Sequence, residues 1–285
     1  MTGATHDVPL PRRRSGRERL IGLGLTYLAA VLLALFILVP IYLIAVAAFT
    51  PRADAFTYPR SVIPTAVSTE TILFFLNASG VIDSFWRSVW VALITLGLSL
   101  AIGAPAGYAI ARYAFRGRQA YRLVILSTRA FPIVILAIPL AVTYRVWNID
   151  DTIIGVAFMH TALALPFTVL ITSSVFVSVP RELEEAAQTL GCNPLQAFLR
   201  VSLPLALPGL AAAAIFTWVL SWNDVFAAVI LTLRNPTLPA KILTALTQSP
   251  IYYQFAAGFV MLIPSIIVIF VIRRYLLGLW GRVVK

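Results

Sequence analysis

Three consecutive residues, Trp222, Asn223 and Asp224, place an indole ring, an amide and a carboxyl group toward the end of a long apolar run. An ionisable group at membrane depth is costly, so it usually faces a water-filled cavity or a polar partner. In one interpretation these residues line the path of a polar solute, with the indole stacked on a ring of that solute. In the other they are structural, and Asn223 and Asp224 tie helices together or cap a break in the run.

A second polar group in an apolar environment is Arg129, the seventh residue of the run Leu123–Tyr144. At 1.5 Å per residue its Cα lies roughly 10 Å inside the run. The long side chain can extend to the nearer membrane surface, which is the interpretation we favour. The alternative is that Arg129 lines an inner part of a translocation path.

The residue types needed for catalysis or metal binding are scarce. Cys192 is the only cysteine, and His6 and His160 lie far apart, so neither a disulfide nor a zinc site is expected. His160 lies inside an apolar run, where it could line a polar cavity, but helix packing is the role we favour. A phosphate-binding loop requires Gly-Lys followed by Ser or Thr, but Lys241 and Lys285 both follow other residues. We therefore expect no enzyme and no cofactor in this chain, and any ATP that drives it must be hydrolysed by a separate subunit.

The polar segment 178–204 predicts two short helices separated by a sharp break. Pro180 suits the first turn of a helix, and Gly191 suits a left-handed cap at its end. Asn193 can cap the next helix, with Gln196 at the reciprocal capping-box position. One face of the first helix is apolar at helical spacing, because it carries Leu183, Ala186, Ala187 and Leu190. Such a segment should dock onto a partner protein or onto the chain's own helices.

The composition indicates a membrane protein that must position these groups. Hydrophobic residues make up 60% of the 285 residues and charged residues 12%, whereas soluble domains are about 25% charged. The mean hydropathy is +0.91. The net charge of +11 does not indicate nucleic-acid binding, because the arginines cluster at the ends of apolar runs, as in membrane proteins.

Six apolar runs are near the ~20 residues needed to cross a bilayer, which predicts an all-α polytopic membrane protein. The predicted spans are residues 20–49, 85–111, 123–144, 153–177, 208–232 and 256–275. Residues 1–19 are then an N-terminal tail and residues 20–285 a single transmembrane domain. Basic residues gather in the tail and near residues 112–122, 181–200 and 273–285, so we expect these parts and both termini to be cytoplasmic.

The segment 178–204 also resembles a known family. The order Glu-Ala-Ala, three residues, Gly, nine residues, a β-branched residue, one residue and Leu-Pro is that of the EAA loop of ABC importer permeases. The residues that carry it are Glu185, Ala186, Ala187, Gly191, Val201, Leu203 and Pro204. The stretches 107–112 and 221–226 resemble the second permease subunit of maltose-type sugar importers.

The resemblance implies a type I ABC importer permease fold with a coupling helix between the fourth and fifth spans. It implies that Glu184, Glu185, Ala186, Ala187, Gly191, Leu203 and Pro204 couple the chain to an ATPase. The implied partners are a homologous second permease, two ATPase subunits that bind ATP and Mg²⁺, and an extracytoplasmic solute-binding protein. The implied location is the bacterial cytoplasmic membrane.

The solute implied by the resemblance is a sugar or a related polyol, and a polyamine or a glycerol phosphate remains an alternative. An ion-coupled secondary transporter is disfavoured because it would need more intramembrane ionisable groups than Asp224 supplies. A membrane enzyme is disfavoured by the scarcity of catalytic residues.

Overall fold

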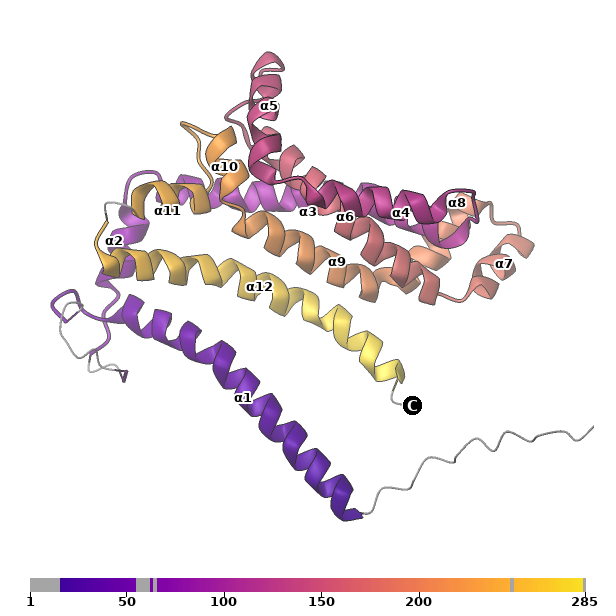
Figure 1. The fold of residues 1–285 in the computed structure, drawn as a ribbon, viewed down its shortest axis with the longest axis horizontal. Helices are drawn as coiled ribbons and strands as arrows, with labels where there is room; N and C mark the ends of the chain where they lie inside the picture. Colours follow the sequence, from indigo (N-terminus) through magenta and orange to yellow (C-terminus); the bar gives the residue numbers. More distant parts are fainter. Residues whose placement is uncertain (1–15, 55–61, 64–65, 247–248, 284–285) are drawn as a thin grey trace, which may run out of the picture.

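The computed structural model describes residues 16–54, 62–63, 66–246 and 249–283, which form helices and connecting turns (Figure 1). Residues 1–15, most of the predicted tail, lie outside the described residues. The elements are α1 (Gly16–Phe49), α2 (Glu70–Asn77), α3 (Val81–Arg112), α4 (Arg118–Ser127), η1 (Thr128–Ala130), α5 (Ile133–Val146), α6 (Ile153–Ser178), α7 (Arg181–Thr189), α8 (Pro194–Ala197), η2 (Phe198–Ser202), α9 (Leu203–Asn223), α10 (Phe226–Leu231), α11 (Leu238–Leu246) and α12 (Ile251–Val283).

Five helical stretches in the described residues are long and apolar enough to cross a membrane. They are Leu20–Phe49, Val81–Arg112, Ile153–Ser178, Pro194–Asn223 and Ile251–Arg273. The predicted all-α polytopic class is therefore confirmed. Helix α1 already begins at Gly16, so the last residues assigned to the tail are helical. Helix α12 extends beyond both ends of the predicted sixth span.

The predicted third span is not one straight helix. Its residues form α4 and η1, followed by α5 after a bend of 87°, and this pair completes the count of six only if it is taken as one broken span. Phe131, at the bend, has an extended backbone (ψ 124°) and precedes Pro132, the N-cap residue of α5. A residue before proline is disfavoured in the helical region, which explains why the helix stops there.

The predicted fifth span, 208–232, is also divided. Helix α9 begins at Leu203 and ends at Asn223, and the short helix α10 follows the extended residue Asp224 (ψ 127°). Apolar content alone does not show this break, because the segments before Asn223 and after Asp224 are both hydrophobic. The polar contacts of Asp224, described below, supply the reason for it.

Helices α3, α6 and α9 form the centre of the molecule, and α12 packs against α9. Close approach of α3 to α6 depends on small residues. A Cβ atom added at Gly103 would lie 2.6 Å from Cγ2 of Thr168, and one added at Gly107 would overlap the Thr172 hydroxyl. The side chain of Thr172 in turn donates to the backbone carbonyl of Gly103 across this interface (2.9 Å). Small residues therefore allow the tight contact that holds the centre together.

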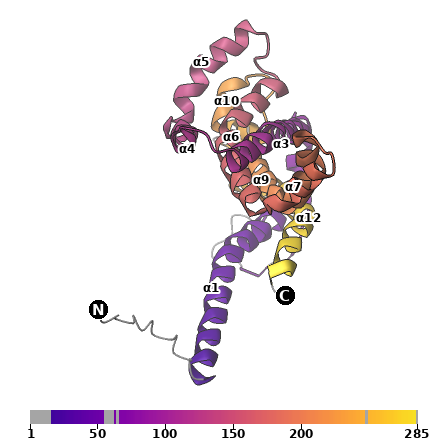
Figure 2. The same cartoon turned by 90° about the vertical axis from the view of Figure 1, so that its right-hand side faces the viewer.

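Two apolar helices leave this centre. The first half of α1 runs away from the other helices, and α5 projects on another side (Figures 1 and 2). In the most apolar window of the span Leu20–Phe49 none of the residues is buried. Phe36 of α1 is 80% exposed, and Ile135 and Val142 of α5 are also exposed. These surfaces require lipid or another membrane protein to cover them.

Candidate functional site

The α7–α8 segment (residues 181–197) has the predicted helix–break–helix structure at one end of the bundle (Figure 1). Gly191 adopts a left-handed conformation (φ 94°). Its N–H donates to Gln188 O, and the N–H of Cys192 donates to Ala187 O. This pair of bonds is a Schellman motif, which satisfies carbonyl groups left open at the end of α7.

The second half of this segment begins a helix that continues into α9. The side chain of Asn193 accepts from the Gln196 N–H (2.8 Å), and the Gln196 side chain accepts from the Asn193 N–H (3.0 Å). The predicted capping box is therefore present. After α8, a π-helical turn leads directly into α9, where Leu203 and Pro204 occupy the first turn.

The apolar face predicted for α7 is uncovered. Leu183 is 45% exposed and Leu190 88% exposed, and Ala186 beside them is exposed as well. Glu185 also points to solvent, where its only charged contact among the described residues is with Arg181 one turn earlier (3.2 Å). An apolar patch with a charged rim is typical of a surface that binds another protein.

Glu184 differs from its neighbours because its side chain points into the protein and is 4% exposed. Oε1 accepts from Nε of Arg112 (2.7 Å), and Oε2 accepts from the hydroxyl of Tyr108 (2.8 Å). Arg112 also donates to the backbone carbonyl of Val179, just before α7 (2.9 Å). These contacts attach α7 to the last turns of α3.

The electrostatics of this contact favour the ionised carboxylate. Burial by itself raises the pKa of Glu184, but the hydrogen bonds and positive charge of Arg112 and the hydrogen bond from Tyr108 outweigh it, so the pKa lies below its ordinary value. The charged pair is therefore stable at neutral pH although it is buried.

Trp222, Asn223 and Asp224 occupy three different environments at the break between α9 and α10. The Trp222 ring is completely buried, stacks on Trp218, and donates from Nε1 to the backbone carbonyl of Met261 in α12 (2.9 Å). The Asn223 side chain is exposed and donates to Val219 O (2.9 Å). In this conformation Trp222 connects helices, and Asn223 is the accessible polar group.

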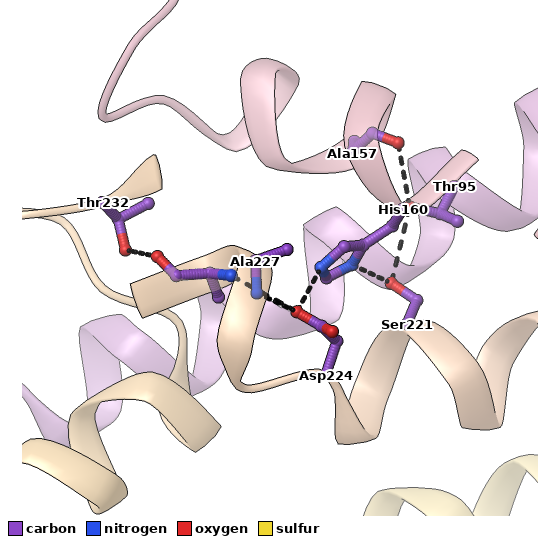
Figure 3. Close-up of polar contacts among 8 residues, drawn as sticks. Thr95, Ala157, His160, Ser221, Asp224, Ala227 and Thr232 are labelled. Atoms are coloured by element: carbon purple, nitrogen blue, oxygen red, sulfur yellow. Dashed lines mark hydrogen bonds and ion pairs between the residues drawn. The ribbon is translucent and has the colours of Figure 1, made fainter. Parts of the chain in front are cut away.

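Asp224 caps the break (Figure 3). Its Oδ2 accepts from the backbone N–H groups of Ala227 (3.1 Å) and Ala228 (3.3 Å) at the start of α10. The same oxygen is 3.1 Å from Nε2 of His160 in α6. His160 is 1% exposed, so the histidine assigned to helix packing is a buried polar partner of the break, 64 residues away in sequence.

Arg129 lies in η1, at the bend between α4 and α5. Nη1 donates to the backbone carbonyl of Leu163 (2.7 Å), and the guanidinium lies 4.4 Å from the centre of the Phe167 ring. Pro166 lies between these two residues of α6, where a proline weakens the helical hydrogen bonding of the preceding turn. Arg129 thus ties the bend to α6.

Asp151 is a further anchoring residue, in the link before α6. It has φ 54°, and its carboxylate accepts from the backbone N–H groups of Leu233 (2.9 Å), Arg234 (3.1 Å) and Asn235 (3.0 Å). Three consecutive backbone N–H groups of the loop after α10 are therefore held by one carboxylate. Residues near Asp151 in the sequence give no sign of this role, because its partners lie more than 80 residues away.

The family model of the binding-protein-dependent transport system inner membrane component matches residues 100–277. This range includes the α7–α8 segment, the α9–α10 break and their partner helices. The chain belongs to this family. It is therefore a transport subunit of the ABC transporter permease class, with several membrane-crossing helices.

Individual relatives agree with this assignment. The trehalose transport system permease protein SugB of Mycobacterium tuberculosis is 34% identical over 70% of this chain and 75% of its own length. The diacetylchitobiose uptake system permease protein NgcG of Streptomyces coelicolor is 28% identical over 90% of this chain and 86% of its own. Among solved structures, a bacterial ABC transporter involved in the import of the acidic polysaccharide alginate has the same fold, with a TM-score of 0.69 and 22% identity over 93% of this chain and 99% of the other.

Proposed function

We propose that this permease is one of two membrane subunits of a binding-protein-dependent importer that takes up a sugar or a related polyol. It would lie in the bacterial cytoplasmic membrane with both termini and α7 on the cytoplasmic side. The observation that carries the proposal is the α7–α8 segment, whose apolar face is exposed while Glu184 attaches its other side to α3. Such a helix can receive motion from a bound protein and pass it to the bundle.

The proposed route of coupling has two branches. An ATPase subunit, which binds ATP and Mg²⁺, would hold the exposed face of α7, including Glu185, Ala186 and Ala187. Movement of α7 would pull on α3 through Glu184 and Arg112. It would also act on α9, because α8, η2 and the first turn of α9 at Leu203 and Pro204 follow one another without a loop. Two ATPase subunits would serve the two permeases.

The exposed apolar helices support the second permease as a partner. The free surfaces of α1 and α5 are too apolar for water, and a bilayer or a homologous subunit would cover them. The translocation path would then lie between the two permeases. Asn223, with its exposed amide beside the α9–α10 break, is the polar group we assign to that path, and Arg129 is a second candidate. A solute-binding protein would dock at the end opposite α7.

The relatives support a carbohydrate as the solute, since the two curated proteins above carry the names of trehalose and diacetylchitobiose uptake systems. The test is a solute screen on the importer complex reconstituted with its binding protein, read as stimulated ATP hydrolysis. We expect stimulation by oligosaccharides or polyols. Stimulation by a polyamine or a glycerol phosphate and by no carbohydrate would contradict the proposal.

The coupling role has its own test on α7. We expect Glu185→Arg to weaken ATPase binding by about tenfold or more, because it reverses a charge at the rim of the proposed contact. Asp83→Arg makes a like charge reversal at an exposed carboxyl group in the first turn of α3, at the opposite end of that helix from Arg112, and is the control. Equal ATPase binding by the Glu185→Arg variant and the unchanged protein would refute the assignment of this face.

A further inference from the structure

An apolar groove runs along the first half of α9, between α3 and α12. Its volume is about 510 Å³, which is within the range of pockets that hold small organic ligands. Helix α9 packs against both α3 and α12, and Ala104 of α3 and Ala211 and Ala214 of α9 are buried at the floor of the groove. Leu199 and Leu207 on its rim are 50% and 49% exposed. Small residues at the floor and larger ones at the rim thus form an open depression.

The groove has the character and the length of a site for a hydrocarbon chain. Its lining contains only Leu, Ala, Pro, Phe and Ile side chains. From Leu203 to Ala214 the lining follows α9 for roughly 16 Å, at 1.5 Å per residue. One leaflet supplies about half of the ~30 Å hydrocarbon core of a bilayer. One acyl chain can therefore lie in the groove from the membrane surface to the middle of the bilayer.

The end of the groove nearest α7 is basic. The start of α9 and the last turns of α12 lie at the same end of the bundle as α7 (Figure 1). Arg200 directly follows the lining residue Leu199, and Arg273 directly follows the lining residue Ile272. Both arginines are exposed. The guanidinium of Arg273 lies 3.7 Å from the centre of the Phe270 ring, a contact that leaves its charge uncompensated.

The segments beside these arginines supply no acidic partner. Residues 194–223 and 251–283 contain no Asp or Glu, and the acidic residue of α3, Asp83, lies in its first turn at the far end. In α7, which packs against η2, two of the three glutamates, Glu184 and Glu185, already form ion pairs with arginines. An apolar groove with a basic end matches an anionic group joined to a hydrocarbon chain.

We propose that this groove binds one anionic phospholipid, with an acyl chain along α9 and the phosphate at Arg200 and Arg273. The second acyl chain remains in the bilayer. This binding site goes beyond the proposed transport function. In the orientation of that proposal the basic end lies at the cytoplasmic surface, where arginine side chains attract anionic lipids.

The bound lipid also contacts the connection between the α7–α8 segment and α9. Phe198 and Leu199, which line the groove, belong to η2, the π-helical turn of this connection. An acyl chain in the groove therefore supports η2 against α3 and α12.

A helix of the second permease is the competing occupant, since small residues at the floor also suit helix packing. The two arginines favour the lipid, because an apolar helix would bring no negative charge to them. Cross-linking to lipids of different charge distinguishes the two occupants.

The test uses the whole importer complex in lipid nanodiscs, without solute or ATP. The nanodiscs contain a phospholipid with a photoactivatable diazirine in its acyl chain, and its headgroup is that of either phosphatidylglycerol, which is anionic, or phosphatidylcholine, which has no net charge. Peptide mass spectrometry then locates the cross-links and measures their yield at the lining residues of α9. Both leaflets have the same composition, so the result depends neither on the proposed orientation nor on the solute, and each of those proposals keeps its own test.

We expect the cross-linking yield in the groove to be about tenfold or more higher with phosphatidylglycerol than with phosphatidylcholine, because each arginine near the surface contributes about fivefold. Arg200→Gln should lower this ratio about fivefold, and Arg200→Gln combined with Arg273→Gln should bring it close to one. Both substitutions are at exposed side chains and leave the core unchanged. Arg234→Gln, at an exposed arginine in the loop after α10, is the matched control and should leave the ratio as it is.

Three results would overturn the proposal. Equal yields from the two lipids in the unchanged complex would show a surface that any lipid covers. No cross-link from either lipid in an intact complex would show that a protein segment fills the groove. An unaltered ratio in the double variant would show that Arg200 and Arg273 do not hold the phosphate.

Discussion

Arg112 at the end of α3 and Glu184 in α7 form a buried ion pair, although 72 residues separate them in sequence. Nε of Arg112 donates to the Glu184 carboxylate, and Nη2 donates to the backbone carbonyl of Val179. The pair thus fixes both the start of α7 and its inward face. In the proposed mechanism it is the connection through which α7 moves α3.

Removing one partner of this pair should be strongly destabilising. Glu184→Ala leaves the Arg112 guanidinium buried without its counter-charge, a change that costs about 3–5 kcal/mol. Thermal denaturation of the purified complex should show a clear drop in Tm. Arg181→Ala, which breaks the exposed Arg181–Glu185 pair, should cost less than about 1 kcal/mol. Equal effects of the two variants would contradict the structural role of Glu184.

Because the pKa of Glu184 is lowered, the stability of the folded protein should depend on pH in the acidic range. A carboxyl group whose pKa is lower in the folded state contributes its full stabilisation above its ordinary pKa of 4.5 and loses it as the pH falls through the lowered value. The Tm of the unchanged complex should therefore fall below pH 4.5 more steeply than that of Glu184→Gln. Parallel curves for the two proteins from pH 6 to pH 3 would show that Glu184 is not responsible.

Glycine at position 107 should be indispensable for packing, whereas glycine at position 97 of the same helix should not. A Cβ at Gly107 overlaps Thr172, and a Cβ at Gly97 has open space within 4 Å. We expect Gly107→Ala to lower the Tm of the complex, because α3 and α6 must separate. Gly97→Ala should raise stability slightly, by up to about 1 kcal/mol, through helix propensity. A neutral Gly107→Ala variant would contradict the close contact.

Asp151 should control the loop that follows α10. Asp151→Ala removes the acceptor of the Leu233, Arg234 and Asn235 N–H groups. Hydrogen exchange at these three amides should accelerate by about tenfold or more, since each loses a charge-assisted bond. Asp150→Ala is the matched control, because that neighbouring carboxylate makes only a long contact with Arg145 (3.8 Å) among its described ion pairs. Unchanged exchange in Asp151→Ala would disprove the anchor.

Features that depend on neighbours in the chain could be predicted from the sequence. Apolar runs identify most spans because crossing a bilayer requires a minimum length of hydrophobic helix. The break at Gly191 and the capping box of Asn193 and Gln196 were predictable, because caps involve groups only a few residues apart. The bend at Pro132 was missed although its signal was present, since a proline after Phe131 disfavours continuation of the helix.

The sequence by itself determined the class of this protein, its membrane-crossing segments and the shape of the α7–α8 segment, since each follows from hydrophobicity or from contacts within one turn. Only the tertiary structure decided the environments of the polar groups. Glu184 and Glu185 are adjacent in sequence, yet one is buried on Arg112 and the other is exposed. His160 and Asp224 meet because α6 packs against α9 and α10, and a contact over 64 residues depends on that packing alone.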